Sequence, residues 1–380
     1  MIPYGWHHLD EEDIAAVSSV LRGGLLTQGE EVGRFEEAFA RRCRVAHAVA
    51  CNSATAGLIL ACRALDLGPG DRLWTSPLSF VASASCALHC GATVDFVDID
   101  PLSGNLSIPA LEAKLQAARR NASLPKVVVV VHFAGRPCAL DEIARLADEF
   151  GFVVVEDAAH ACGADYQGEP VGSCRYSSAT VFSFHPVKLI TTGEGGMVTC
   201  RDRQLAERMQ RLRSHGIERR EAFAAESGPG GWYYEAIELG YNFRLTDFQA
   251  ALGRSQLRHL DRFVARRRAL ALRYHQRLSG LPLTLPQLAD DGHSAWHLYV
   301  VQVAAQKRRR VYDRMRAGGV AVAVHYIPLY RQPLFAGSGT DYPGCECYYA
   351  GALTLPLYPD LQECEQEQVI ERLGEALTAE

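Results

Sequence analysis

The chain has 380 residues, a hydrophobic content of 48%, a charged content of 22% and a formal net charge of −5. This length predicts two domains, or one large domain with a smaller addition. The slightly acidic balance offers no basic footprint for nucleic acid. The chain opens without a signal-like apolar stretch, and its most apolar run, residues 127–131, is far shorter than the ~20 residues that span a bilayer. We therefore expect a cytoplasmic protein without nucleic-acid or membrane partners.

The twelve cysteines do not form a metal-binding pattern. Cys86 and Cys90 are four residues apart, Cys345 and Cys347 are two apart, and no Cys-x-x-Cys pair occurs. Most of the others lie among apolar or small residues, namely Cys51, Cys62, Cys138, Cys162, Cys174 and Cys200. We expect no metal site and interpret these cysteines as buried, reduced thiols.

Two amphipathic helices are predicted at the start of the chain. The first follows Asp10, a plausible N-cap, and its apolar residues at helical spacing are Ile14, Val17, Val20 and Leu21. A polar loop at Thr27-Gln28-Gly29 leads to the second helix, whose apolar residues are Val32, Phe35 and Phe39.

Strands and helices then alternate. Predicted strands cover residues 46–51, 72–75, 93–97, 127–131 and 152–155. One predicted helix follows the turn at residues 52–57 and runs through Leu65. The other predicted helices cover residues 79–88, 111–118 and 140–150. This alternation is typical of an α/β fold with a mainly parallel sheet that is covered on both faces.

The pattern changes after residue 254. A long helix is predicted over residues 255–278, followed by shorter strands at 298–303 and 320–326 that are mixed with helices and proline-rich loops. We therefore expect a large α/β domain over residues 1–254 and a smaller α+β domain over residues 255–380.

The most informative residue is Lys188, which closes the run that begins at Ser183. Hydroxyl and glycine residues follow it at 191–196, and the strand-end Asp157 lies thirty-one residues upstream. An amine, a carboxylate and small donors are the groups that pyridoxal phosphate needs: the amine for its aldehyde, the carboxylate for its ring nitrogen and the donors for its phosphate.

Each neighbouring candidate also has a structural interpretation. Asp157 follows an apolar strand, at the edge where open α/β sheets bind ligands, but it is equally a possible helix cap or metal ligand. The turn at residues 52–57 joins a strand to a helix and predicts a phosphate site, assisted by Ser183, or ordinary capping. Phe80 is either a stacking ring or a core residue, and His160 is either a site residue or a core histidine.

The glycine-rich segment 193–196 does not have the spacing of a dinucleotide fingerprint, and no acidic residue ends a following strand. A nicotinamide-dependent oxidoreductase is therefore disfavoured. The glycines are better explained by a tight turn beside Lys188.

Taken together, these motifs resemble the DegT/DnrJ/EryC1/StrS family of sugar aminotransferases, which are fold type I pyridoxal-phosphate enzymes. The resemblance covers nearly the whole chain. It rests on residues 26–29, 52–55, 79–82, 131–135, 156–160, 183–196, 240–247 and 325–329, together with Tyr4. It implies a seven-stranded type of mainly parallel sheet in the large domain.

The resemblance also implies roles for individual residues. Lys188 would form the Schiff base and shuttle protons, and Asp157 would pair with the pyridine nitrogen. The other implied cofactor contacts are Phe80 on the ring, His160 near the phenolic oxygen, and Ala54, Thr55 and Ser183 on the phosphate. Asn242 would reach the phosphate from a neighbouring subunit, which implies a homodimer. The implied nucleotide-sugar pocket comprises Tyr4, Leu26, Thr27, Gln28, Gly29, His325, Tyr326, Ile327 and Pro328. Arg244 is either a contact for the carboxylate of the amino donor or an interface ion pair.

Within the family, the run from Ser183 to Lys188 and the histidine at 160 favour the branch of pseudaminic acid biosynthesis. That branch aminates C-4 of UDP-4-keto-6-deoxy-N-acetyl-β-L-altrosamine, with L-glutamate as the donor. Another nucleotide-linked keto-sugar is the alternative substrate, and the segment from Glu218 to Tyr234 leaves substrate selection open. A related dehydratase is disfavoured because it carries histidine in place of Lys188. A non-catalytic pyridoxal-phosphate-binding regulator is the alternative from another class.

Overall fold

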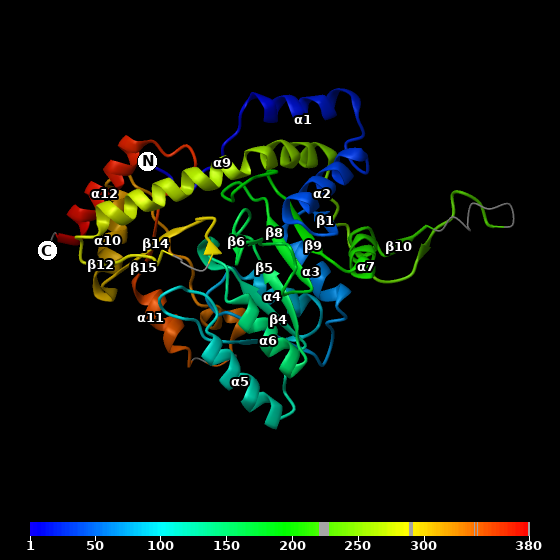
Figure 1. Ribbon diagram of the computed structural model, residues 1–380, viewed down its shortest axis with the longest axis horizontal. Helices are drawn as coiled ribbons and strands as arrows, with labels where there is room; N and C mark the ends of the chain where they lie inside the picture. Colours follow the sequence, from blue (N-terminus) through cyan, green and yellow to red (C-terminus); the bar gives the residue numbers. More distant parts are fainter. Residues whose placement is uncertain (220–227, 289–291, 338, 340, 379–380) are drawn as a thin grey trace.

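The computed structural model describes residues 1–219, 228–288, 292–337, 339 and 341–378 (Figure 1). Its central sheet has seven strands: β1 (His47–Cys51), β2 (Arg72–Thr75), β3 (Thr93–Phe96), β4 (Val127–Val131), β5 (Val153–Asp157), β8 (Ala179–Ser183) and β9 (Gly196–Cys200). Their spatial order is β1-β9-β8-β5-β4-β2-β3. The strands from β8 to β3 pair in parallel, whereas β9 runs antiparallel to both of its neighbours. The predicted mainly parallel α/β sheet is confirmed.

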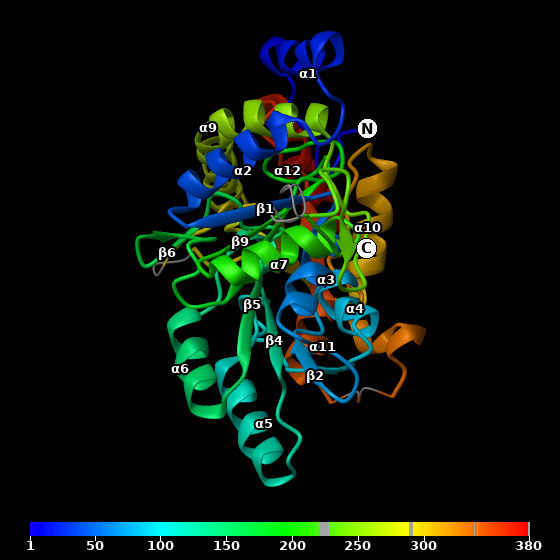
Figure 2. The same ribbon diagram turned by 90° about the vertical axis from the view of Figure 1, so that its right-hand side faces the viewer.

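Helices cover both faces of this sheet (Figure 2). The helices before the C-terminal part are α1 (Glu11–Gly23), α2 (Glu30–Cys43), α3 (Ala54–Ala64), α4 (Ala82–His89), α5 (Ile108–Arg120), α6 (Leu140–Phe150), α7 (Arg203–Arg213) and α9 (Asp247–Leu278). In β4, Val127 and Val129 pack with α3, α4 and α7, whereas Val128 and Val130 pack with α5 and α6. All four are fully buried, which explains why this strand is uniformly apolar.

The C-terminal part contains a smaller sheet, in the order β12-β14-β15, formed by β12 (Leu283–Thr284), β14 (Tyr299–Val303) and β15 (Ala352–Leu355). Its helices are α10 (Ala305–Ala317), α11 (Pro343–Gly351) and α12 (Glu363–Thr378). Short elements complete the fold: β6 (Asp165–Tyr166), β7 (Glu169–Pro170), β10 (Ile217–Glu218), β11 (Glu235–Ala236), β13 (Gly292–His293) and the 3-10 turns η1 (Phe133–Gly135), η2 (Leu329–Arg331) and η3 (Pro333–Phe335). Among the described helices, none is long and apolar enough to cross a membrane.

Several predicted elements differ from the structure, among them the helix predicted at residues 111–118, which covers Ile108–Arg120 as α5. The strand predicted at residues 320–326 is wrong: only Val320 and Ala323 form isolated bridges, to Ile2 and Thr354. The segment is therefore held by two separate partners rather than by one ladder. The helix predicted from residue 255 begins at Asp247, because Thr246 and Gln249 form a capping box. The helix continues without a break across residues 254 and 255, where we expect the boundary between the two domains. That domain boundary stays a prediction. The helix α4 begins at Ala82 rather than at residue 79.

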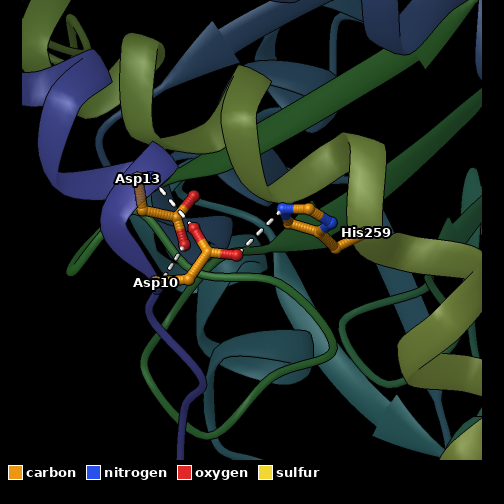
Figure 3. Close-up of side chains that lie close together, drawn as sticks. All are labelled: Asp10, Asp13 and His259. Atoms are coloured by element: carbon orange, nitrogen blue, oxygen red, sulfur yellow. Dashed lines mark hydrogen bonds and ion pairs between the residues drawn. The ribbon is translucent and has the colours of Figure 1, made fainter.

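The predicted N-cap of α1 is confirmed, and the same carboxylate connects α1 to α9 (Figure 3). Asp10 accepts hydrogen bonds from the backbone of Glu12 and Asp13, and its other oxygen lies 3.3 Å from Nε2 of His259 on α9. The carboxylate of Asp13 accepts hydrogen bonds from the backbone nitrogen of Asp10 and from the side-chain amide of Gln256 on α9. Capping and pairing with α9 account for this cluster of acidic and histidine side chains.

The first residue of β9, Gly196, packs directly against the turn that begins α3. An added Cβ at this position would lie 2.6 Å from the carbonyl carbon of Ser53 and 2.7 Å from the nitrogen of Ala54. Ser53 is the N-cap of α3 and accepts from the backbone of Ala56. A side chain at residue 196 would therefore displace the start of a buried helix.

We predict that Gly196→Ala lowers the free energy of unfolding by about 1–3 kcal/mol or more, because the backbone of the turn cannot move aside freely. Gly33→Ala is the matched control: Gly33 is exposed on α2, and an added Cβ meets nothing within 4 Å. That control should be neutral or stabilising by up to ~1 kcal/mol, through helix propensity. Urea unfolding measures both variants, and equal effects would contradict the prediction.

Candidate active site

A cavity of about 930 Å³ opens at the carboxyl edge of the central sheet. Strand ends contribute Val131 from β4, Asp157 from β5 and Ser183 from β8. The remaining lining residues are Tyr4, Asn52, Ser53, Ala54, Thr55, Leu58, Phe80, Ala82, Ser83, Ala159, His160, His185, Val187, Lys188, Glu194, Gln249, His297, His325 and Tyr326. Such an edge is where open α/β sheets bind ligands.

Lys188 reaches this cavity from the loop between β8 and β9. Its backbone donates to the carbonyl of His185, and the next two residues, Leu189 and Ile190, are buried in the core. Burial lowers the pKa of Lys188 to about 8, although the Asp157 carboxylate opposes this shift. The buried guanidinium of Arg267 adds to the lowering. A substantial fraction of the amine is therefore neutral, and nucleophilic, near physiological pH.

Both oxygens of the Asp157 carboxylate accept hydrogen bonds. Oδ2 accepts from the hydroxyl of Ser83 at 2.6 Å, and Oδ1 accepts from the backbone nitrogen of Ala159 at 3.1 Å. The side chain of Asp157 is therefore fixed while it still contributes to the cavity wall. The alternative role as a helix cap is wrong, because no helix begins at this residue among the described elements.

The start of α3 presents small polar groups to the cavity. Ser53, Ala54 and Thr55 all line it, together with Ser183 from the end of β8. The first backbone N–H groups of a helix have no intrahelical acceptor, and with nearby hydroxyls they form an anion site. Ser53 also caps the helix, so the capping interpretation of this turn is confirmed, while the phosphate site stays a prediction.

Three of the four histidines that line the cavity are held neutral by burial. Burial lowers the pKa values of His160 and His297 well below the ordinary value, and that of His325 to about 4. The rings of His160 and His297 lie 4.3 Å apart. Nε2 of His160 is 3.1 Å from the hydroxyl of Tyr326, and its buried Nδ1 has no hydrogen-bond partner in the described part of the chain. These rings act as neutral hydrogen-bonding groups near Lys188.

The cavity brings together ten of the predicted residues: Tyr4, Ala54, Thr55, Phe80, Asp157, His160, Ser183, Lys188, His325 and Tyr326. Phe80 is 58% exposed, so its interpretation as a core residue is wrong. Tyr4 lies beside His325, with ring centroids 5.5 Å apart, and Nδ1 of His325 is 2.8 Å from the hydroxyl of Thr354.

The other predicted residues do not line the cavity of this single chain: Leu26, Thr27, Gln28, Gly29, Asn242, Arg244, Ile327 and Pro328. Asp247 at the start of α9 holds both Leu26 and Gly29: its backbone nitrogen donates to the carbonyl of Leu26, and its side-chain Oδ2 accepts from the backbone nitrogen of Gly29. Asn242 is exposed a few residues before that helix. The segment from Glu218 to Tyr234 leaves substrate selection open, and its residues 220–227 lie outside the described residues.

Sequence reasoning missed three polar residues of the cavity wall. Ser83 follows Ser79 by one helical turn, a spacing that could have placed both hydroxyls on one face. Gln249 completes the Thr-x-x-Gln capping pattern of α9, which is a readable signal. No periodic or local signal marks His297, because the small C-terminal part brings it to the cavity from far along the chain.

The sequence matches the DegT/DnrJ/EryC1/StrS aminotransferase family over residues 7–374. The chain belongs to this family. It is 39% identical, over 97% of its length and 95% of the relative, to the spore coat polysaccharide biosynthesis protein SpsC of Bacillus subtilis. It is 34% identical to a UDP-4-amino-4,6-dideoxy-N-acetyl-beta-L-altrosamine transaminase of Campylobacter jejuni, over 95% of the chain and 93% of the relative.

Helicobacter pylori PseC, an aminotransferase involved in the biosynthesis of pseudoaminic acid, has the same fold as this member of the DegT/DnrJ/EryC1/StrS family. The TM-score is 0.91 at 30% identity, with 99% of both chains covered. The protein is therefore a pyridoxal-phosphate-dependent nucleotide-sugar aminotransferase of fold type I.

We predict that an amine-reactive reagent such as acetic anhydride acylates Lys188 in the cofactor-free protein, and that the rate plotted against pH has its midpoint near pH 8. Only the neutral amine is nucleophilic, so the rate should rise with pH and level off above this value. Mass spectrometry of the Lys188 peptide gives the rate. In the urea-unfolded chain the midpoint should return to near the ordinary value of 10.5. A folded midpoint at that higher value would contradict the assigned burial.

Proposed function

We propose that this enzyme transfers an amino group from L-glutamate to C-4 of a UDP-4-keto-6-deoxy-N-acetylhexosamine in pseudaminic acid biosynthesis. The observation that carries the proposal is the buried Lys188 amine, with its pKa lowered to about 8, in one cavity with the Asp157 carboxylate. The substrate class is supported by the likeness to the Campylobacter transaminase and to PseC.

The groups around the cavity fit pyridoxal phosphate. Asp157 would pair with the ring nitrogen, and the exposed face of Phe80 would stack on the ring. His160, which lines the same cavity, would approach the phenolic oxygen. Ala54, Thr55 and Ser183 would hold the phosphate at the start of α3.

When bound, the cofactor supplies an aldehyde that accepts amines and a ring that withdraws electrons. The protein supplies the proton transfers. Nζ of Lys188 is neutral often enough to take the proton from the donor's α-carbon and to return one at C-4 of the sugar. Burial keeps His160, His297 and His325 neutral, so these three rings add no positive charge beside the amine.

For the sugar nucleotide, we propose a site that two copies of the chain build together. Tyr4, His325 and Tyr326 line the cavity of one copy. The second copy would supply Asn242 to the phosphate and Arg244 to the donor carboxylate. It would also complete the nucleotide pocket with residues 26–29, while Ile327 and Pro328 close it near Tyr326. The working unit would be a cytoplasmic homodimer, and the free cysteines, ten of them buried, agree with a reducing compartment.

Another nucleotide-linked keto-sugar is the second candidate substrate, because the identity to SpsC, 39%, exceeds the 34% to the Campylobacter transaminase. Both candidates use the same lysine and cofactor. They differ only in the keto carbon, its stereochemistry and the nucleotide. A panel of 3-keto and 4-keto sugar nucleotides, with the product's amine position read by NMR, distinguishes them; no turnover of 4-keto UDP-sugars would overturn the first candidate.

We predict that L-glutamate alone discharges the visible absorbance of the purified, pyridoxal-phosphate-loaded enzyme, because the first half-reaction needs no sugar. Lys188→Ala should abolish this change and lower turnover by roughly 10²–10⁴-fold or more, since it removes the group that moves protons. Absorbance after mixing and 2-oxoglutarate release measure the effect.

Lys307→Ala, which removes a lysine from α10 outside the cavity wall, is the matched control and should behave like the wild type. Persistent colour with glutamate and every other amino acid donor would overturn the aminotransferase assignment and favour a regulatory role. Normal turnover by Lys188→Ala would overturn the role of the lysine.

A further inference from the structure

The hydroxyls of Ser79 and Ser83 form a chain of two hydrogen bonds that ends at the Asp157 carboxylate. The hydroxyl of Ser83 donates to Oδ2 of Asp157 at 2.6 Å, and the hydroxyls of Ser79 and Ser83 are also 2.6 Å apart. Ser83 is fully buried and Ser79 is 1% exposed. Hydrogen bonds from hydroxyl to carboxylate at this distance are among the stronger ones in proteins.

The direction of these bonds follows from counting protons. Because an ionised carboxylate only accepts, the single proton of Ser83 goes to Asp157. The oxygen of Ser83 then accepts, and Ser79 is the hydroxyl beside it. Ser79 therefore donates its one proton to Ser83, and the carbonyl of Phe80, 2.8 Å away, competes for that proton. Because Ser79 precedes Phe80 in the chain, the two hydroxyls connect Asp157 to the turn that carries Phe80.

This turn holds a second group that the cavity needs. Phe80 begins the approach to α4, and the backbone of Ser83 donates to the Phe80 carbonyl at 3.2 Å. The ring of Phe80 and the hydroxyl of Ser83 thus project from one short segment, and both line the cavity with Asp157. We therefore expect a change at Ser83 to release Oδ2 of Asp157 from that segment, while Oδ1 stays bound to the backbone of Ala159.

We propose that Ser83, supported by Ser79, is a positioning residue for cofactor binding: it fixes the Asp157 carboxylate at a set spacing from the Phe80 ring. The inference rests on the proposed roles of Asp157 and Phe80. The carboxylate meets the edge of a flat cofactor at its ring nitrogen, and Phe80 meets its face. One rigid turn that holds both sets the tilt of the cofactor as well as its affinity.

The experiment compares pyridoxal-phosphate binding by the full-length protein with that of Ser83→Ala. We predict that the dissociation constant rises about tenfold or more, the effect expected for a lost hydrogen bond to a charged group. The visible circular dichroism of the bound cofactor, divided by its absorbance, should fall because the ring is no longer held at one angle. Ser83→Thr keeps the hydroxyl and should recover both values.

Ser76→Ala is the matched control. Ser76 is buried in the same connection, and its hydroxyl accepts from the backbone of Leu78, outside the cavity wall. The Ser76→Ala variant should lose about as much thermal stability as Ser83→Ala. Its dissociation constant for the cofactor and its dichroism ratio should stay at the wild-type values. Equal values of both readouts for Ser83→Ala and Ser76→Ala would overturn the proposal.

Two further variants keep the result decisive. If Ser83→Ala does not fold, Ser79→Ala removes only the supporting hydroxyl and should change both readouts in the same direction by less; values equal to those of Ser76→Ala would then overturn the proposal. Asp157→Asn tests the role on which the inference rests. If Asp157→Asn binds the cofactor with unchanged affinity, the proposed role of Asp157 is wrong. If Asp157→Asn loses most of its cofactor affinity while Ser83→Ala keeps that of the wild type, only the role of Ser83 is wrong.

Discussion

The chemistry that we propose for this protein depends on removing the Lys188 amine from water. A protonated amine is not a nucleophile, and burial is the main reason that its pKa falls to about 8. The Asp157 carboxylate acts in the opposite direction, so the two groups have to share a cavity without forming a tight ion pair. Burial keeps His160, His297 and His325 neutral, so the charge of the amine is set by its own burial, by the Asp157 carboxylate and by the buried guanidinium of Arg267.

The sheet topology produces this arrangement. Because β9 returns antiparallel to β8, the loop that carries Lys188 must lie at the carboxyl edge of the parallel strands, where β5 ends in Asp157. Leu189 and Ile190 fix the loop in the core immediately after the lysine. Gly196 then lets β9 approach the turn at Ser53 closely, so amine, carboxylate and the start of α3 converge on one cavity.

Much of this could be predicted because it is local in sequence. The five consecutive valines of β4 and the alternation of strands with helices predict the sheet, and the strand-end Asp157 with Lys188 downstream among hydroxyl and glycine residues predicts its reactive edge. His297 could not be found in the same way, because its place depends on how the C-terminal part packs. The strand expected at residues 320–326 failed for a related reason: Val320 pairs with Ile2 and Ala323 with Thr354, two partners that no local pattern reveals.

The same long-range contacts place the side chains proposed for the sugar nucleotide and those proposed for the cofactor on different parts of the fold. Ile2 pairs with the backbone at residues 319 and 321, and the carbonyl of Tyr4 accepts from Leu357. Tyr4 is thereby fixed to the C-terminal part, beside His325, whereas Lys188, Asp157 and the start of α3 belong to the central sheet. The continuous helix α9 connects the two parts, since it packs in the cores of both. A small change in that packing would move the side chains proposed for the sugar nucleotide relative to the lysine, while the cofactor groups kept their own spacing.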